Sequence, residues 1–286
     1  MPALLEICVD DSAGLRAAVA GGADRIELCS ALELGGLTPS AALVEQAVQT
    51  GCPIHMMIRP RAGGFVLAEG EAALMIEEIR LAVARGVAGV VVGALRPDGG
   101  LDREALARFR DAAQGATLVL HRAIDLVPDP VAAVREAAAL GYDNILSSGG
   151  APTAILGMPV LAAMVAEAGQ RLSIIAGSGV TPANVARLVA ETGVDEVHGS
   201  ASAPGPEPDA ATLRLGFASG PRRHTDRMIV AQLRAALAEG KHERSHLTTR
   251  RAGSRRRRHF GGERHQGGAG RSGRGRLHLG FRQGRQ

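Results

Sequence analysis

Short apolar stretches alternate with longer amphipathic ones along most of the chain, and turn residues separate them. Runs of three to six mainly aliphatic residues are typical of buried strands. The predicted strands cover 4–9, 25–29, 53–58, 89–92, 117–121, 144–146, 172–175 and 194–198. A helical segment follows each strand: the first is expected to be capped by Ser12, the second opened by Thr38-Pro39 and the seventh capped by Thr181-Pro182. The pattern therefore predicts repeated β-then-α units.

Eight such units with short connections indicate a (β/α)8 TIM barrel, which fits a domain covering residues 1–240. A doubly wound open sheet is the alternative, because a count of units does not establish closure. The first strand is not followed by the glycine fingerprint of a dinucleotide-binding or phosphate-loop fold. The barrel is therefore the expected fold.

The composition narrows the class of protein. Hydrophobic residues make up 45% of the chain, so the predicted domain can bury a large core, whereas aromatic residues make up only 2%. A chain so poor in aromatic rings is a poor candidate for binding single-stranded nucleic acid by base stacking. No apolar run reaches the roughly 18 residues of a membrane span, and the first residues do not resemble a signal peptide. The three cysteines are too few for a disulfide framework, which favours the reducing cytoplasm.

The charge is divided sharply between two segments. Residues 241–286 contain 14 Lys and Arg but 2 Asp and Glu, whereas residues 1–240 have a net charge of −8. The Arg/Gly-rich tail has almost no apolar residues and is expected to be disordered. It is either a basic arm for nucleic acid or a non-native appendix without a selected function.

Several predicted strands carry polar residues at every second position, although strands of a parallel sheet are normally apolar on both faces. Glu6 and Cys8 share one face of the first strand, and Arg25, Glu27 and Cys29 share one face of the second. Burying a lone charge is costly, so these groups need partners or water. They are therefore predicted to point into the barrel lumen and its mouth. A plug of mutually neutralised ions is the alternative for the deeper residues.

Cys8 and Cys29 are the candidate metal ligands, since both lie near the carboxyl ends of adjacent strands. Neighbouring strands are about 4.8 Å apart, so the two sulfurs are expected to reach one ion. Thiolates select soft metals such as Cu(I). The alternative is that each cysteine is simply a small buried hydrophobic residue.

The loops after the seventh and eighth strands form a candidate anion site, because many barrels bind phosphate there through backbone N–H groups. Two arginines after the third strand add positive charge to the same rim. The glycines alternatively serve only to make tight turns. The predicted anion-binding residues are Arg59, Arg61, Gly177, Ser178, Gly179 and Ser200.

A third group suits acid–base chemistry. Glu27, His121, Asp125 and His198 all lie at or just beyond the carboxyl ends of predicted strands, where barrel active sites are found. A histidine exchanges protons near neutral pH, and a carboxylate orients it or takes the complementary role. These residues indicate a site without specifying a reaction.

Several segments together resemble the CutC copper homeostasis family, over about residues 3–239. They are 6–10, 21–30, 36–40, 57–61, 121–123, 148–149 and 198–201. The resemblance implies a TIM barrel, a cytoplasmic location and copper bound through two cysteines, which fall on Cys8 and Cys29.

Two classes of function are therefore expected. The first is a copper homeostasis protein that binds Cu(I) in the cytoplasm. The second is a TIM-barrel enzyme acting on a small anionic or phosphorylated substrate, with Glu27 and His121 moving protons. No membrane partner is expected, nucleic acid is a partner only through the tail, and a homo-oligomer is compatible with the sequence.

Overall fold

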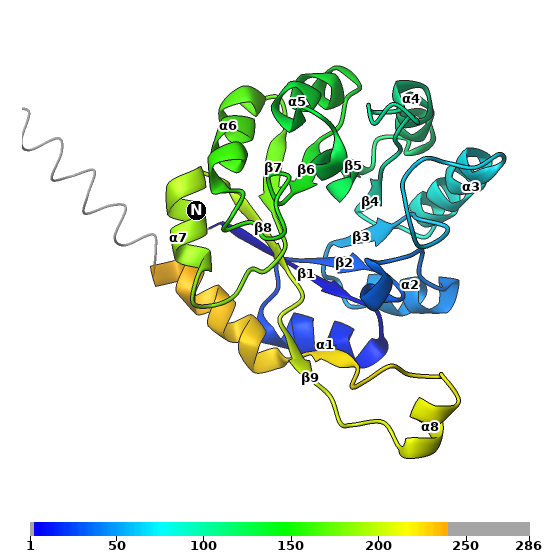
Figure 1. The fold of residues 1–286 in the computed structure, drawn as a ribbon, viewed down its shortest axis with the longest axis vertical. Coiled ribbons are helices and arrows are strands. Elements are labelled where there is room, and N and C mark those ends of the chain that lie inside the picture. Colours follow the sequence, from blue (N-terminus) through cyan, green and yellow to red (C-terminus); the bar gives the residue numbers. More distant parts are fainter. Residues whose placement is uncertain (1–2, 240–286) are drawn as a thin grey trace, which may run out of the picture. The chain divides into compact units, whose positions relative to one another are not determined.

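The structure, a computed structural model, describes residues 3–239. The tail, with its predicted disorder and nucleic-acid binding, lies outside the described residues. Eight parallel strands run in sequence order β1 to β8 and close into a barrel, because β8 pairs with β1. Helices surround this barrel on the outside (Figure 1). The predicted (β/α)8 fold is confirmed, and the open-sheet alternative is wrong.

The strands are short and begin and end close to the predicted positions. The barrel strands are β1 (Leu4–Val9), β2 (Arg25–Leu28), β3 (Ile54–Met57), β4 (Gly89–Val92), β5 (Thr117–Leu120), β6 (Asn144–Ser147), β7 (Ser173–Ala176) and β8 (Glu196–Gly199).

Helices or helical turns connect the strands. They are α1 (Ser12–Gly21), η1 (Leu32–Leu34), α2 (Ala41–Val48), α3 (Glu71–Ala84), α4 (Arg103–Ala112), η2 (Arg122–Leu126), α5 (Pro130–Ala139), α6 (Met158–Ala168) and α7 (Val185–Thr192). A final helix covers 227–239. None of the described helices is long and apolar enough to cross a membrane.

Three predicted helix starts are wrong by one to three residues. Asp11, not Ser12, caps α1, because its carboxylate accepts the N–H of the third residue along. Ser40 caps α2, so the Thr38-Pro39 pair precedes the helix. Asn184 occupies the cap position of α7, beyond Thr181-Pro182. Several polar residues near each start are acceptable caps, and the backbone path chooses among them.

The register of the strands separates two apolar regions. Leu5 and Ile7 of β1 face outward and belong to the large core between barrel and helices. The alternate residue Glu6 lies beside Arg25 of β2 and beside His198 of β8, so these three share the inner face. A second, smaller apolar cluster fills part of the lumen, and its members are Cys29, Met57, Val91, Val119, Leu146 and Ile175.

One excursion was not predicted from the sequence. Between β8 and the final helix the chain forms β9 (Ser202–Pro204), the short helix α8 (Ala210–Arg214) and β10 (Arg223–Thr225), and β9 pairs antiparallel with β10. The segment carrying α8 extends away from the barrel beyond α1 (Figure 1). Ser202 of β9 and Arg223 of β10 both line the cavity at the barrel mouth, so the excursion contributes to the site described next.

Candidate functional site

Buried ions fill the bottom of the lumen. The Arg25 guanidinium donates to Glu6 through Nε and to Glu196 through Nη2, each at 2.5 Å. Asn144 Nδ2 donates to Glu196 Oε1 at 2.8 Å. These side chains neutralise one another, so the deeper polar residues form the ionic plug that the sequence left as an alternative.

His198 links this plug to the cavity above it. Its Nδ1 donates to Glu6 Oε1 at 2.7 Å, and its Nε2 lies 3.8 Å from Glu27 Oε2. Burial opposes the charged imidazolium, but the Glu27 carboxylate and the Glu6 hydrogen bond raise the pKa of His198 well above its usual value. Burial also opposes ionisation of Glu6, yet His198 and Arg25 hold the pKa of that carboxyl well below its usual range. His198 is therefore a buried cation with a carboxylate on each side.

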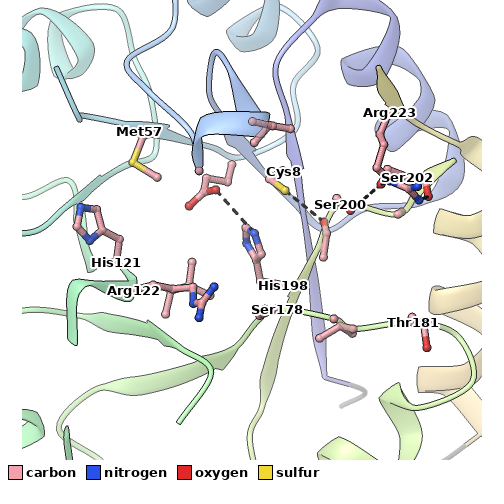
Figure 2. A pocket seen from close by; sticks show the side chains of 18 of the residues that line it. Cys8, Met57, His121, Arg122, Ser178, Thr181, His198, Ser200, Ser202 and Arg223 are labelled. Carbon is pink, nitrogen blue, oxygen red and sulfur yellow. Dashed lines mark hydrogen bonds and ion pairs between the residues drawn. The ribbon is translucent and has the colours of Figure 1, made fainter. Parts of the chain in front are cut away.

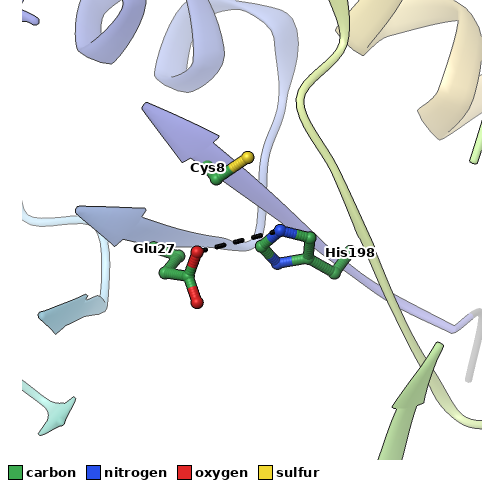
Figure 3. A group of neighbouring side chains, drawn as sticks. All are labelled: Cys8, Glu27 and His198. Carbon is green, nitrogen blue, oxygen red and sulfur yellow. Dashed lines mark ion pairs between the residues drawn. The ribbon is translucent and has the colours of Figure 1, made fainter. Parts of the chain in front are cut away.

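Cys8, Glu27 and His198 form a group able to hold a metal ion. One donor atom from each lies within 4.8 Å of the other two (Figure 3). In β1 and β2, Cys8 and Glu27 are direct register partners, which explains why their side chains are adjacent. Cys29 is not a member of this group. The geometry thus offers Cys8 a carboxylate and an imidazole as partners.

The Cys29 thiol instead contacts Glu27, donating to Oε2 at 3.5 Å. Burial and the neighbouring Glu27 charge raise the pKa of Cys29 well above its usual value. Burial likewise raises the pKa of Glu27. Glu27 Oε1 is buried and has no hydrogen-bond partner among the described residues, so this oxygen is available to a ligand.

His121 is buried and uncharged. Its Nδ1 accepts the Ala123 N–H at 3.1 Å, which places the ring proton on Nε2. Burial, together with the charge of Arg59, lowers the pKa of His121 to about 3. Nε2 has no partner in the described part of the chain. His121 was predicted to exchange protons, whereas this geometry suits a neutral hydrogen-bond donor.

Two glycines, one in β4 and one just after it, leave room for the rings of two histidines. A Cβ at Gly93 would lie 2.2 Å from the His121 ring, and one at Gly89 would lie 2.7 Å from the His55 ring. The His121 ring also packs against Phe65, with centroids 4.8 Å apart. Close approach therefore requires glycine at both positions.

The two arginines predicted to bind an anion donate most of their hydrogen bonds to other groups of the protein. The Arg59 guanidinium donates to the carbonyls of Leu34, Gly36 and Gly63 at 2.8–3.0 Å. Arg59 thereby fastens the loops after β2 and β3, although it still lines the cavity. Arg61 pairs with Glu71 and does not line the main cavity.

The carboxylate of Asp125 is likewise hydrogen-bonded to other groups of the protein. Its carboxylate accepts hydrogen bonds from the Ser147 and Ser148 hydroxyls, from the Ser148 and Gly150 N–H groups and from Arg122. It does not line the cavity. The geometry gives Asp125 the role of a loop anchor and does not support the predicted acid–base role.

Most of the remaining candidates, but not Cys29, line an open cavity of about 690 Å³ at the carboxyl ends of the strands. Figure 2 shows His121 and Met57 on one side, Ser200, Ser202 and Arg223 on the other, and Cys8 and His198 between them. Ser178 and Gly179 also line this cavity, whereas Gly177 does not. The predicted thiol, acid–base and anion groups therefore converge on one space.

Sequence reasoning missed several residues of this wall, among them one aromatic and one basic residue. Phe65 comes from the loop after β3, and Arg223 comes from the unpredicted β10. The only signal for Arg223 was the long polar, Gly- and Pro-rich stretch between the eighth strand and the final helix.

Comparisons with known proteins agree with this architecture. The profile of the CutC family matches residues 3–203. A CutC family protein from Sinorhizobium medicae is 47% identical over 234 residues, covering 82% of this chain and 96% of that protein. One from Agrobacterium fabrum is 46% identical over 239 residues, covering 83% and 95%.

Among solved structures, a candidate copper homeostasis protein CutC from Streptococcus agalactiae is 34% identical, with a TM-score of 0.67. The match covers 69% of this chain and 98% of that one. The barrel, the profile match and these relatives together show that the chain belongs to the CutC family.

Proposed function

We propose that this protein binds Cu(I) as its cargo in copper homeostasis, at Cys8 and His198 with Glu27 beside them. The observation that carries the proposal is the group of three donor atoms within 4.8 Å of one another. A thiolate and an imidazole are soft and borderline ligands that suit Cu(I). The name of the Streptococcus agalactiae relative supports the same metal.

The surroundings of His198 fit a ligand. A metal-binding histidine usually donates its other ring N–H to a carboxylate, and His198 Nδ1 donates to Glu6 Oε1 at 2.7 Å. Nε2 is thereby directed to the side of Cys8 and Glu27. Ligation requires Cys8 and Nε2 to lose their protons, so copper binding is expected to release protons. The three free thiols suit the reducing cytoplasm expected from the sequence.

Competition with a chromophoric Cu(I) chelator under anaerobic conditions tests this assignment. C8S and H198Q are each expected to weaken Cu(I) binding at least about 100-fold, or ~2.7 kcal/mol. C29S is the matched control and is expected to keep wild-type affinity, since Cys29 lies outside the group. If both C8S and H198Q bound Cu(I) with wild-type affinity, the copper proposal would be wrong. Loss in C29S with retention in H198Q would restore the two-cysteine site predicted from the sequence.

A second candidate function is acid–base catalysis on a small anionic substrate. Two polar atoms at the cavity wall, Glu27 Oε1 and His121 Nε2, are buried without partners among the described residues. Such atoms are costly unless a ligand satisfies them. In this reading His121 donates a hydrogen bond to a substrate oxygen, and Glu27 takes a proton while the His198 imidazolium stabilises the resulting charge.

The two functions are separated by different variants. H121N keeps an acceptor for the Ala123 N–H but removes the Nε2 donor, whereas C8S removes the thiol. We expect H121N and E27Q to slow deuterium exchange from solvent into small phosphorylated ketones, with E27Q slowed at least about 100-fold. C8S is expected to leave that exchange unchanged. Absence of exchange in the wild-type protein across such a panel would contradict the catalytic candidate and leave the copper proposal standing.

A further inference from the structure

We propose that the loops after β7 and β8 hold the phosphate group of a small phosphate monoester. This inference deepens the second candidate function by naming its substrate class, and it does not depend on copper. The seat is defined as Ser178, Gly179 and Val180 after β7 with Ser200 and Ala201 after β8, all of which line the cavity.

The seat consists of free backbone donors. Within residues 3–239, the N–H groups of Ser178, Gly179, Val180, Ser200 and Ala201 have no hydrogen-bond acceptor. Backbone N–H groups in concave turns bind anions, and phosphate oxygens accept several such bonds at once. Five donors in two adjacent loops exceed what one carboxylate group accepts comfortably, so a phosphate is favoured over a carboxylate.

The backbone of the seat is held in an unusual conformation. Ser178 has φ 81° and Ala201 has φ 44°, although neither is glycine, and Gly179 follows Ser178 with φ 69°. Such conformations are costly for residues with side chains, and they cluster at ligand clamps. The Ser178 hydroxyl donates to the Pro152 carbonyl at 2.8 Å, which fixes this turn.

The charge around the cavity independently favours an anion. Three arginines line it, Arg59, Arg122 and Arg223, against one carboxylate, Glu27. Arg122 and Arg223 each use Nε and Nη2 in hydrogen bonds, so Nη1 of each has no partner among the described residues. The rim of the cavity is therefore positive where a dianion enters.

His121 Nε2 shows that the ligand extends beyond its phosphate. This buried donor, on a residue 4% exposed, has no acceptor among residues 3–239 and lies on the opposite side of the cavity from Ser200 (Figure 2). A cavity of about 690 Å³ is also far larger than a free phosphate ion needs. Met57 and Leu146 supply an apolar wall between the two ends. A carbon skeleton carrying an oxygen at its far end and phosphate at the near end satisfies both sets of donors.

Thermal unfolding and calorimetric titration of the full chain test the seat, with inorganic phosphate, glycerol 3-phosphate and glycerol as probes at constant ionic strength. S200D places a negative charge in the seat. S219D adds the same charge at an exposed serine that does not line the cavity and is the matched control. The basic tail is identical in all three proteins, so differences between them report on the seat.

Both phosphate probes are expected to raise the Tm of the wild-type protein and of S219D, with glycerol 3-phosphate binding more tightly than inorganic phosphate and glycerol giving no shift. S200D is expected to weaken glycerol 3-phosphate binding at least about 10-fold, because like charges repel in the seat. R223A is expected to weaken it less, and it changes no residue of the seat itself. Equal affinity in wild type and S200D, or no phosphate-dependent shift in the wild type, would overturn the proposal. The affinity of S200D for Cu(I) is expected to be unchanged. Loss of phosphate binding can therefore be told apart from loss of copper binding.

Discussion

The two halves of the barrel lumen are lined by different kinds of side chain. Strands β1, β2, β3 and β8 contribute the charged side chains, whereas β4 to β7 contribute mainly apolar ones, Val91, Val119, Leu146 and Ile175, with Asn144 of β6 as a polar exception. Most residues of both halves are buried, yet one half is held by ion pairs and the other by packing. The cavity opens over both.

The cavity therefore lies at the boundary between the two halves. Glu27 and His198 on the polar half face the same space as Leu146 on the apolar half. His121, at the end of β5, supplies the one uncharged donor on the apolar side with no described partner. The ionisable groups of the cavity therefore lie mainly on one wall, and its apolar surface lies mainly on the other.

Removing the central charge of the polar half is expected to have the largest effect. E6Q keeps the shape of Glu6 but leaves Arg25 with only Glu196, and His198 with only Glu27, as a carboxylate partner. Because both cations are buried, we expect this to cost about 3–5 kcal/mol in unfolding free energy. Urea denaturation measures this loss. The control E71Q removes the partner of the more exposed Arg61 and is expected to cost much less, because solvent screens an exposed ion pair. If E6Q cost no more than E71Q, the ion network would be irrelevant to stability.

The dependence of stability on pH is expected to change next most. Burial lowers the pKa of His121 to about 3, against 6.5 for a free histidine. Between these values the unfolded chain binds a proton that folded His121 does not, so stability falls as pH falls. H121N is expected to reduce this slope by up to about 1.4 kcal/mol per pH unit, measured by urea denaturation between about pH 5 and 6. Parallel curves for both proteins would show that His121 is protonated in the folded state.

His198 has the opposite sign, which makes it an internal control. Its raised pKa stabilises the folded protein below the ordinary histidine pKa, and this contribution is lost as the pH rises through the folded value. H198Q is therefore expected to lose less stability on the alkaline side than the wild type does, while keeping the acid-side slope.

The smallest effect is expected in the apolar half. I175V removes one methylene group from a side chain that is fully buried and is expected to cost about 0.5–1.5 kcal/mol. Because no charge is involved, the loss measured by urea denaturation should be the same at low and high salt. A strong dependence on salt would show that packing and ion pairing are not separated as the two halves suggest.

The sequence predicted the placement of the inner residues well, because a one-residue shift in a strand moves every side chain to the other face. The alternation of Glu6 with Leu5 and Ile7 was enough to place Glu6 inside. The count of units favoured a barrel without establishing closure, and the pairing of β8 with β1 confirms it.

The sequence did not show which polar atoms are already occupied. Asp125 and Arg61 have suitable chemistry, yet loop N–H groups and Glu71 use their hydrogen-bonding capacity. Which ring nitrogen of His121 carries the proton depends on its hydrogen bond with the Ala123 N–H. The sequence pattern does not predict this hydrogen bond. These are facts about loop geometry, and loops have no periodicity from which geometry can be predicted.

The two glycines at positions 89 and 93 limit which residues neighbouring strands can carry in related proteins. Each leaves empty the volume that a histidine from an adjacent strand fills, His55 from β3 and His121 after β5. A descendant that gained even an alanine at position 93 would have to surrender the His121 ring position. Glycine and histidine at these sites should therefore be inherited as pairs, so that in any relative the smaller residue serves as a marker for the larger one.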